Sequence, residues 1–329
     1  MGIIISGTEV ALSHYRMFIK REEKIMEDRD RMKILIAYDG SECAELAIDD
    51  LKRAGLPTRA EAIVLTIAEE LIPAPTSIGG VATAFAKDLT EEEKESLALA
   101  EQARSRIQAI FPDWKIRAEA GFGSPGGEII ARAGQWLPDL IVMGSHGRTA
   151  LGRKLFGSVS HKVANGAGHS VRVARGRIVE PDVPARIIVG IDGSEGAAAA
   201  VEEIASRNWP VGSEVRIVNS AMTIPPALEP GLSVHLAEQL ARETGRVNKM
   251  IDSAAEKLRS VGLKVSTVVK EQEPKELLCR EAGRFRADCI FVGARGMGRL
   301  GRFLLGSVSS GVAARAHCSV EVVRTKKRA

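Results

Sequence analysis

The chain has 329 residues, of which 45% are hydrophobic and 27% charged, and its formal net charge is +4. This length is enough for two domains of common size, each with its own core. The small net charge argues against a specific nucleic-acid partner, because the only basic run in the sequence is Lys326 to Arg328.

No apolar run is long enough to cross a bilayer, and Met1 to Ile5 lack the basic region that opens a signal peptide. The four cysteines form no CxxC pair, which is typical of reduced thiols. We therefore expect a cytoplasmic protein without a membrane partner and without a metal site of its own.

Residues 1–31 are rich in charge and have no counterpart later in the chain. They are predicted to be an appendage, either a short helix or an over-long gene start, because Met32 directly precedes the first apolar run. From residue 32 two halves run in parallel. Residues 33–38 and 186–191 are predicted strands, and each is followed by Asp-Gly-Ser, at 39–41 and 192–194. Ser41 and Ser194 are predicted helix caps.

A second strand is expected at 62–67 and again at 215–220. The Pro-rich stretches 71–88 and 222–232 are predicted to be irregular, and each could form a lid at the end of its strand. The next helix is predicted to start at a capping box, Thr90 to Glu93. Its expected apolar face is Leu97, Ala100, Ala103, Ile107 and Ile110, and the counterpart face is Leu236, Leu240, Val247, Ile251 and Leu258.

Each half continues through a third strand and a helix to a fourth strand, at 139–144 or 288–293, and closes with a strand at 171–175 or 320–324. Alternating strands and helices predict an α/β fold of two tandem doubly wound, Rossmann-like domains, each with a five-stranded parallel sheet. We expect domains at 32–175 and 185–325, a linker at 176–184 and a basic tail at 326–329.

A glycine-rich loop follows the fourth strand of each half. It reads Gly144-x2-Gly147, nine residues and Gly157-Ser158-Val159-Ser160, and its second copy is Gly293-x2-Gly296, nine residues and Gly306-Ser307-Val308-Ser309. Glycines at a strand's carboxyl end let backbone N–H groups approach phosphates, and the helix N-terminus that follows attracts anions. Small residues that merely end a strand and cap a helix are the alternative. The repeated spacing on different intervening residues favours phosphate binding.

This loop, with Asp-Gly-Ser after the first strand, resembles the universal stress protein family, in particular its ATP-binding branch with an adenine nucleotide alpha hydrolase-like fold. The resemblance implies ATP as the ligand, with Asp39 and Asp192 beside the ribose or a Mg²⁺ ion. It places the backbones of Ile67 and Ser220 at the adenine, although Ser220 replaces an expected apolar residue. It also implies ribose and phosphate contacts from two sets of residues, Met143, Gly144, Gly147, Gly157, Ser158 and Val159, and Val292, Gly293, Gly296, Gly306, Ser307 and Val308.

Other features bear on this interpretation. Arg148 lies beside the first loop with His146, Arg153 and Lys154, and Arg295, Arg299 and Arg302 lie in the second, where they could raise phosphate affinity. The resemblance further implies that the final strands associate near Val171 and Val320, so that one chain imitates a dimer. A homodimer of the tandem and an unidentified protein partner remain open.

Competing functions can be weighed from the sequence. Gly121 to Gly126 fits the dinucleotide pattern GxGxxG but follows the third strand, and neither loop has the GK[ST] of a P-loop. Each Asp after the first strand could also be a turn residue that binds its own backbone. Two functions remain: an ATP-binding regulatory protein of the stress response that is not an enzyme, or a slow Mg²⁺-dependent ATPase or phosphotransferase in which Asp39 or Asp192 assists.

Overall fold

The computed structural model describes residues 31–69, 81–147, 156–175, 183–220, 230–296 and 305–325. Residues 1–30 of the expected appendage at 1–31, most of the linker, the basic tail and the first parts of both expected lids, 71–80 and 222–229, lie outside these residues. Within them, no helix has both the length and the apolar character that a membrane crossing requires.

Ten strands form one continuous sheet, and they come equally from the two halves of the chain. The first half contributes β1 (Met32–Ala37), β2 (Ala60–Ala68), β3 (Lys115–Phe122), β4 (Leu140–Gly144) and β5 (Ser170–Ala174). The second half contributes β6 (Arg186–Gly190), β7 (Glu214–Ser220), β8 (Lys264–Lys270), β9 (Cys289–Gly293) and β10 (Ser319–Val323). The order across the sheet is β3-β2-β1-β4-β5-β10-β9-β6-β7-β8.

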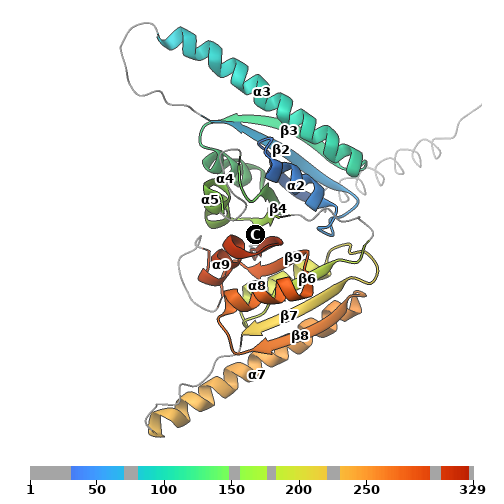
Figure 1. The fold of residues 1–329 in the computed structure, drawn as a ribbon, viewed down its shortest axis with the longest axis vertical. Helices are drawn as coiled ribbons and strands as arrows, with labels where there is room; N and C mark the ends of the chain where they lie inside the picture. The colour runs from blue at the N-terminus through green and yellow to red at the C-terminus, as the bar shows by residue number, and fades with distance from the viewer. Residues whose placement is uncertain are drawn as a thin grey trace, which may run out of the picture.

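Strand pairing confirms the predicted fold class. Within each half all pairs are parallel, and the halves meet where β5 pairs antiparallel with β10, with Arg172 opposite Glu321. The expected association of the final strands is therefore present, and it fuses two five-stranded parallel sheets into one. Figure 1 shows the halves one above the other, with the β5–β10 junction between them.

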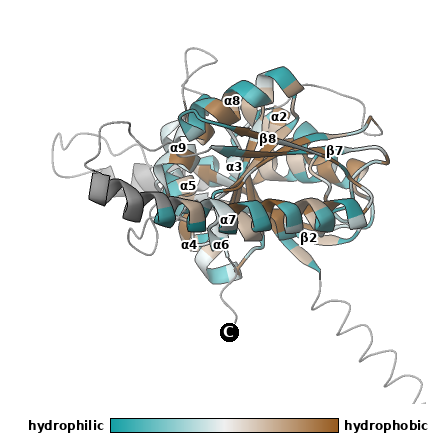
Figure 2. Ribbon diagram, turned by 90° about the horizontal axis from the view of Figure 1, so that it is seen from below, coloured by the Kyte–Doolittle hydropathy of each residue, from teal (hydrophilic) through white to brown (hydrophobic). Residues whose placement is uncertain are grey.

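Helices cover both faces of the sheet in each half. The first half has α2 (Glu42–Leu51) and α3 (Val81–Ile110) packed on one face, and α4 (Pro125–Trp136) and α5 (Ser158–Gly166) on the other. In the second half α6 (Glu195–Ala205) and α7 (Pro230–Ser260) share one core, and α8 (Pro274–Phe285) and α9 (Ser307–Arg315) share another. Successive residues of β1 enter opposite cores, which explains its continuous apolar run. The hydrophobic strands lie inside these helical layers (Figure 2).

Local signals at the start of α2 and α6 are confirmed. The Ser41 hydroxyl accepts a hydrogen bond from the N–H of Ala44 at 3.2 Å, and Ser194 accepts from Ala197 at 3.2 Å. These caps fix the direction of each helix immediately after the Asp-Gly-Ser turn.

The predicted start of the third helix is wrong. The helix begins at Val81 rather than at Thr90, and its counterpart begins at Pro230, so both expected irregular stretches end in helix. Residues 81–89 include three alanines and contain neither glycine nor proline, so no helix breaker precedes Thr90. Leu97 was expected on the apolar face but is 42% exposed, whereas Ala100, Ala103 and Ile107 are buried.

Candidate functional site

Two cavities of about 600 and 500 Å³ lie at corresponding places in the two halves, at the carboxyl ends of the parallel strands. Both volumes fall in the range of small-molecule sites. In an open α/β sheet, ligands bind outside the carboxyl ends, where the connections diverge to opposite faces. In this sheet the divergence lies between β1 and β4, and between β6 and β9.

The cavities bring together the residues that sequence reasoning selected. The first is lined by Asp39, Ile67, Met143, Gly144, Gly147, Gly157, Ser158, Val159 and Ser160. The second is lined by Asp192, Ser220, Val292, Gly293, Gly296, Gly306, Ser307, Val308 and Ser309. Arg148 lies outside the described residues, as do Arg153, Lys154, Arg299 and Arg302.

Close packing gives the first glycine of each loop a structural role. A Cβ on Gly144 would lie 2.7 Å from the backbone carbonyl of Cys43 in α2, and a Cβ on Gly293 would lie 2.4 Å from the carbonyl carbon of Gly196 in α6. Carbon atoms in van der Waals contact are about 3.5–4.0 Å apart. These glycines therefore let each helix approach the strand end, a reason that differs from the backbone approach to phosphate expected from the sequence.

The second glycine of each loop faces the aspartate after the first strand. A Cβ on Gly147 would lie 3.0 Å from Asp39 Oδ2, and a Cβ on Gly296 would lie 2.4 Å from Asp192 Oδ2. The other oxygen, Oδ1, accepts a hydrogen bond from Ser41 N–H or Ser194 N–H at 3.0 Å in both halves. Each aspartate thus closes its own turn with one oxygen and presents the second toward the loop.

The helix that follows each loop begins without a side-chain cap. Gly157 and Gly306 occupy the N-cap positions of α5 and α9, and neither supplies a side-chain hydrogen bond. The N–H groups of the first turn lack intrahelical partners, and the helix dipole makes this end attractive to anions. Ser158 and Ser307 are exposed at these ends and line the cavities.

The last serine of each loop, Ser160 or Ser309, makes a hydrogen bond within the described part of the protein, unlike the exposed Ser158 and Ser307. Ser160 Oγ donates to the Gly144 carbonyl at 2.8 Å, and Ser309 Oγ donates to the Gly293 carbonyl at 2.6 Å. Since a hydroxyl has one proton to donate, these two serines fasten the helix to the strand end instead of offering that proton to the cavity.

The far end of each cavity is built by the second strand. Ile67 is buried in the first half, whereas the equivalent Ser220 donates its hydroxyl proton to the Gln272 carbonyl. Asn219 Nδ2 donates to the Ile191 carbonyl at 2.7 Å, which ties the ends of neighbouring strands together. The polar Ser220 is therefore satisfied internally, and its backbone still lines the cavity.

The described walls of the two cavities differ in charge. The first carries the carboxylates of Asp39, Glu69, Glu92 and Glu95. The second carries those of Asp192 and Glu243, together with the Arg295 guanidinium. Mg²⁺ is commonly held by one or two protein carboxylates plus substrate phosphates, and the Oδ2 atoms of Asp39 and Asp192 fit this use. Among the described residues, no three acidic, His or Cys side chains gather as a metal cage.

His146 is a further feature of the first cavity. Its Nδ1 lies 2.8 Å from Ser145 Oγ, and its buried Nε2 has no hydrogen-bond partner within the described parts of the chain. Burial, followed by the charge of Arg175, lowers the pKa of His146. Burial also raises the pKa of Tyr38, against the opposing effect of Arg106. Both side chains are therefore neutral near pH 7.

Sequence reasoning missed the wall that the long helices supply. Glu92, Glu95, Ser96 and Leu99 of α3 line the first cavity, and Glu243, Thr244 and Asn248 of α7 line the second. Spacings of three or four residues among these side chains show that they share one side of a helix. No local sequence signal shows that α3 and α7 cross the ends of the strands.

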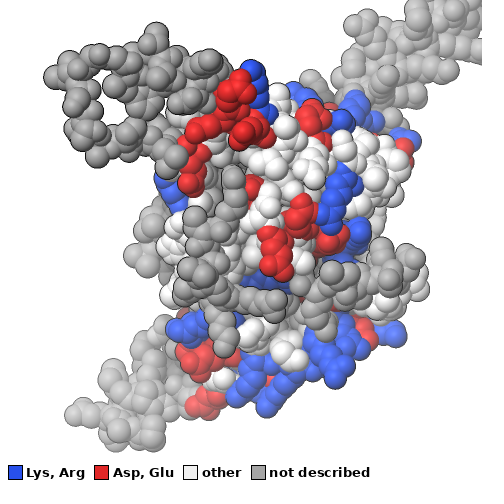
Figure 3. Space-filling view, turned by 45° about the horizontal axis from the view of Figure 1, so that its top comes forward, with Lys and Arg blue, Asp and Glu red and all other residues white. Residues whose placement is uncertain are grey.

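The face in Figure 3 carries acidic side chains mainly in its upper part and basic ones along its lower part. No single sign of charge covers that face. A nucleic-acid-binding protein usually presents a concentrated basic patch or stripe.

Comparison with known proteins agrees with this architecture. The model of the universal stress protein family matches residues 31–175 and 185–324. Universal stress protein Rv2005c of Mycobacterium tuberculosis is 30% identical over 246 residues, which is 71% of this chain and 78% of that protein. Universal stress protein YxiE of Bacillus subtilis is 30% identical over 138 residues, 40% of this chain and 90% of that protein.

Among solved structures, a universal stress protein from Archaeoglobus fulgidus superposes with a TM-score of 0.60 at 20% identity, covering 90% of this chain and 97% of that one. That likeness extends the agreement in fold to both halves together. With the family matched in each half, this chain belongs to the universal stress protein family.

Proposed function

We propose that this chain binds an adenine nucleotide, ATP in the first instance, in the cavity of one or both halves. The observation that supports this proposal is an arrangement that is repeated at the strand ends of both halves. Each half has a helix N-terminus without a side-chain cap, two closely packed glycines in the loop, and one aspartate oxygen directed toward that loop. Uncapped N–H groups suit phosphates, and the apolar wall formed by Ile67, Ile129 and Met143 in the first half suits a purine.

The proposed role is regulatory. In either half, the inward aspartate oxygen is placed to hold a Mg²⁺ ion that accompanies the phosphates. Nucleotide occupancy would then be the state that a partner protein reads in a cytoplasmic stress response. Slow hydrolysis of the bound ATP is the alternative, and the same aspartates would assist it.

Carboxylates line both cavities, four on the described wall of the first and two on that of the second, and they repel a polyanion unless a cation is present. We therefore expect removal of Mg²⁺ to weaken ATP binding.

Labelled ATP with Mg²⁺ tests the proposal and separates it from the alternative. The wild type should retain the label, and Asp39→Asn with Asp192→Asn should retain less. ADP formation that is lost in the double variant would establish hydrolysis, whereas equal trace ADP in both proteins would dismiss it. Failure of the wild type to retain ATP would refute nucleotide binding itself.

A further inference from the structure

The contact between β5 and β10 has approximate two-fold symmetry. Arg175 N–H donates to Ser319 Oγ at 3.0 Å, and Arg324 N–H, at the matching place, donates to Ser170 Oγ at 3.1 Å. Arg172 and Glu321 are each the third residue of their strand, and they face one another in the register. The repeat thus places an arginine in one half at the position where the other half has a glutamate.

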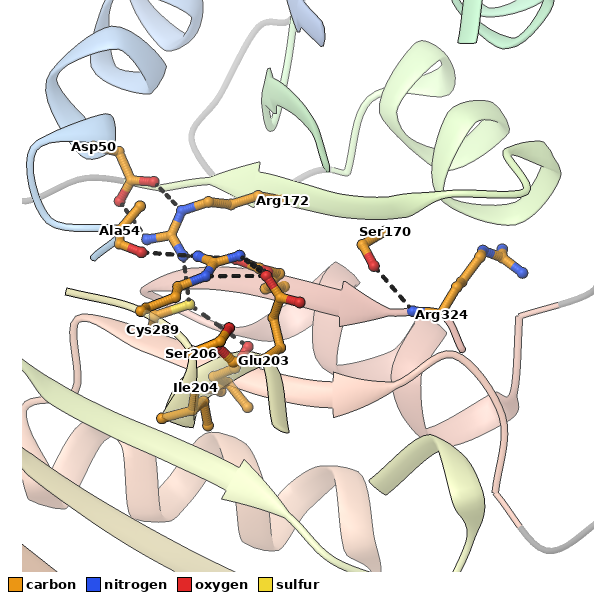
Figure 4. A network of polar contacts seen from close by, with 12 residues as sticks. Asp50, Ala54, Ser170, Arg172, Glu203, Ile204, Ser206, Cys289 and Arg324 are labelled. Carbon is orange, nitrogen blue, oxygen red and sulfur yellow. Dashed lines mark hydrogen bonds and ion pairs between the residues drawn. The ribbon is translucent and has the colours of Figure 1, made fainter. Parts of the chain in front are cut away.

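Arg172 and Glu321 are both fully buried. Figure 4 shows the network around Arg172, whose guanidinium is directed toward Asp50. Arg172 Nη1 lies 3.1 Å from Glu321 Oε2, and Arg172 Nε lies 2.6 Å from Asp50 Oδ2. Glu321 also accepts from Arg207 Nη1 at 3.0 Å, and Arg207 Nη1 donates across the junction to the Ala54 carbonyl at 2.8 Å. The network therefore joins unlike charges from different halves.

A contact between two identical halves would remove this match. Two first halves would place Arg172 opposite Arg172, and each would keep only its own Asp50. Two second halves would place Glu321 opposite Glu321, and each would keep its own Arg207. Like charges directly opposite in an antiparallel pair are destabilising, and buried charges are little screened by salt.

Side-chain shape adds an independent restriction. Gly55, with φ of +64°, leaves room for the ring of Trp209, since a Cβ there would lie 2.9 Å from that ring. Gly55 and Asn208 hold matching places, each two residues before a proline, and Asn208 N–H donates to the Gly55 carbonyl at 2.9 Å. Two second halves would bring Asn208, with its side chain, against the Trp209 ring.

We infer that this junction is selective for unlike halves. The Arg172–Glu321 pair and the fit of Trp209 on Gly55 make the first half a partner for a second half, and they disfavour pairing of either half with a copy of itself. The first half of a chain therefore pairs with the second half of the same chain. A second copy of the chain can use this surface only if the two chains exchange halves. This inference is independent of what the cavities bind.

Cleavage of the full-length protein offers a test. A protease site is placed within 176–182, the intact protein is purified and cut, and both halves are unfolded together in urea and refolded together by dilution. Native mass spectrometry then counts pairs of unlike and of like halves. Random pairing would make the two classes equally abundant. We expect unlike pairs to exceed like pairs at least about tenfold, equivalent to ~1.4 kcal/mol, and equal abundance would overturn the inference.

Two variants identify the cause of the preference. Arg172→Met with Glu321→Met removes the charge difference from matching places, and the preference should fall by about tenfold, again ~1.4 kcal/mol. Lys94→Ala with Glu202→Ala is the matched control, because it removes one positive charge from the first half and one negative charge from the second in exposed ion pairs, and it should leave the preference intact. An unchanged preference in the Met variant, or its loss in the Ala variant, would refute the role of the charge pair.

Discussion

Replacing Gly293 by Ala tests whether close packing of helix on strand explains this glycine. The new Cβ would lie 2.4 Å from the carbonyl carbon and 2.7 Å from the Cα of Gly196. Normal carbon contacts are about 3.5–4.0 Å, so α6 must move away by roughly 1 Å. Backbone cannot rotate aside as a side chain can. We therefore expect a destabilisation near the upper end of the ~1–3 kcal/mol that overpacking usually costs.

Gly245→Ala is the matched control. Gly245 lies within α7, and no heavy atom lies within 4 Å of a Cβ built there. Alanine in a helix interior is favoured over glycine by roughly 0.5–1 kcal/mol, so this variant should be slightly more stable than wild type. Urea denaturation gives both free energies from the midpoints at a common slope. A Gly293→Ala protein as stable as wild type would refute the packing explanation.

Four further outcomes are expected. Gly147→Ala and Gly296→Ala should weaken ATP binding in titrations but change the urea midpoints little. The new Cβ would contact the carboxylate oxygen of Asp39 or Asp192, which can move aside. A large loss of stability without a loss of binding would contradict this. Arg172→Met alone should cost about 3–5 kcal/mol in urea denaturation, since it leaves buried Asp50 without its arginine and Glu321 with Arg207 but without Arg172. Lys94→Ala in an exposed pair should change stability by less than ~0.5 kcal/mol. Burial, followed by nearby arginines, lowers the pKa of His146 and His169. As the pH falls below about 6.5, the unfolded chain therefore takes up protons before the folded chain does, and the free energy of unfolding decreases. His146→Gln with His169→Gln should flatten this decrease, and an unchanged pH profile would count against the explanation. Burial raises the pKa of Cys318 to about 12 and also raises that of Cys289. Alkylation followed by mass spectrometry should therefore find both thiols unlabelled until the protein unfolds. Rapid labelling of either thiol at pH 8 would disprove this.

Much of the fold could be predicted from the sequence because its signals are local. Continuous apolar runs marked the parallel strands, and Ser41 and Ser194 marked helix starts that the structure confirms. The duplicated spacing also selected residues that line two corresponding cavities. Duplication helps because a chance pattern in one half is not repeated in the other.

The remaining features depend on contacts between distant segments. The sequence shows a glycine at 293, but not that Gly196 is packed against it. It shows a serine at 160, but not that the hydroxyl proton is donated to the Gly144 carbonyl. The carboxylates of Glu92 and Glu95 reach the first cavity only because α3 crosses the strand ends. An arginine within an apolar strand becomes interpretable once Glu321 is seen opposite it.

Nucleotide binding at the strand ends is tested most directly by isothermal titration of nucleotide-free protein with ATP and Mg²⁺. Saturable binding with a stoichiometry between one and two ATP per chain, reduced in the double variant Gly147→Ala with Gly296→Ala, is the predicted result. The contradicting result is no heat in the titration and no ATP uptake in equilibrium dialysis at about 1 mM ATP. That concentration would detect a binding free energy as weak as ~4 kcal/mol.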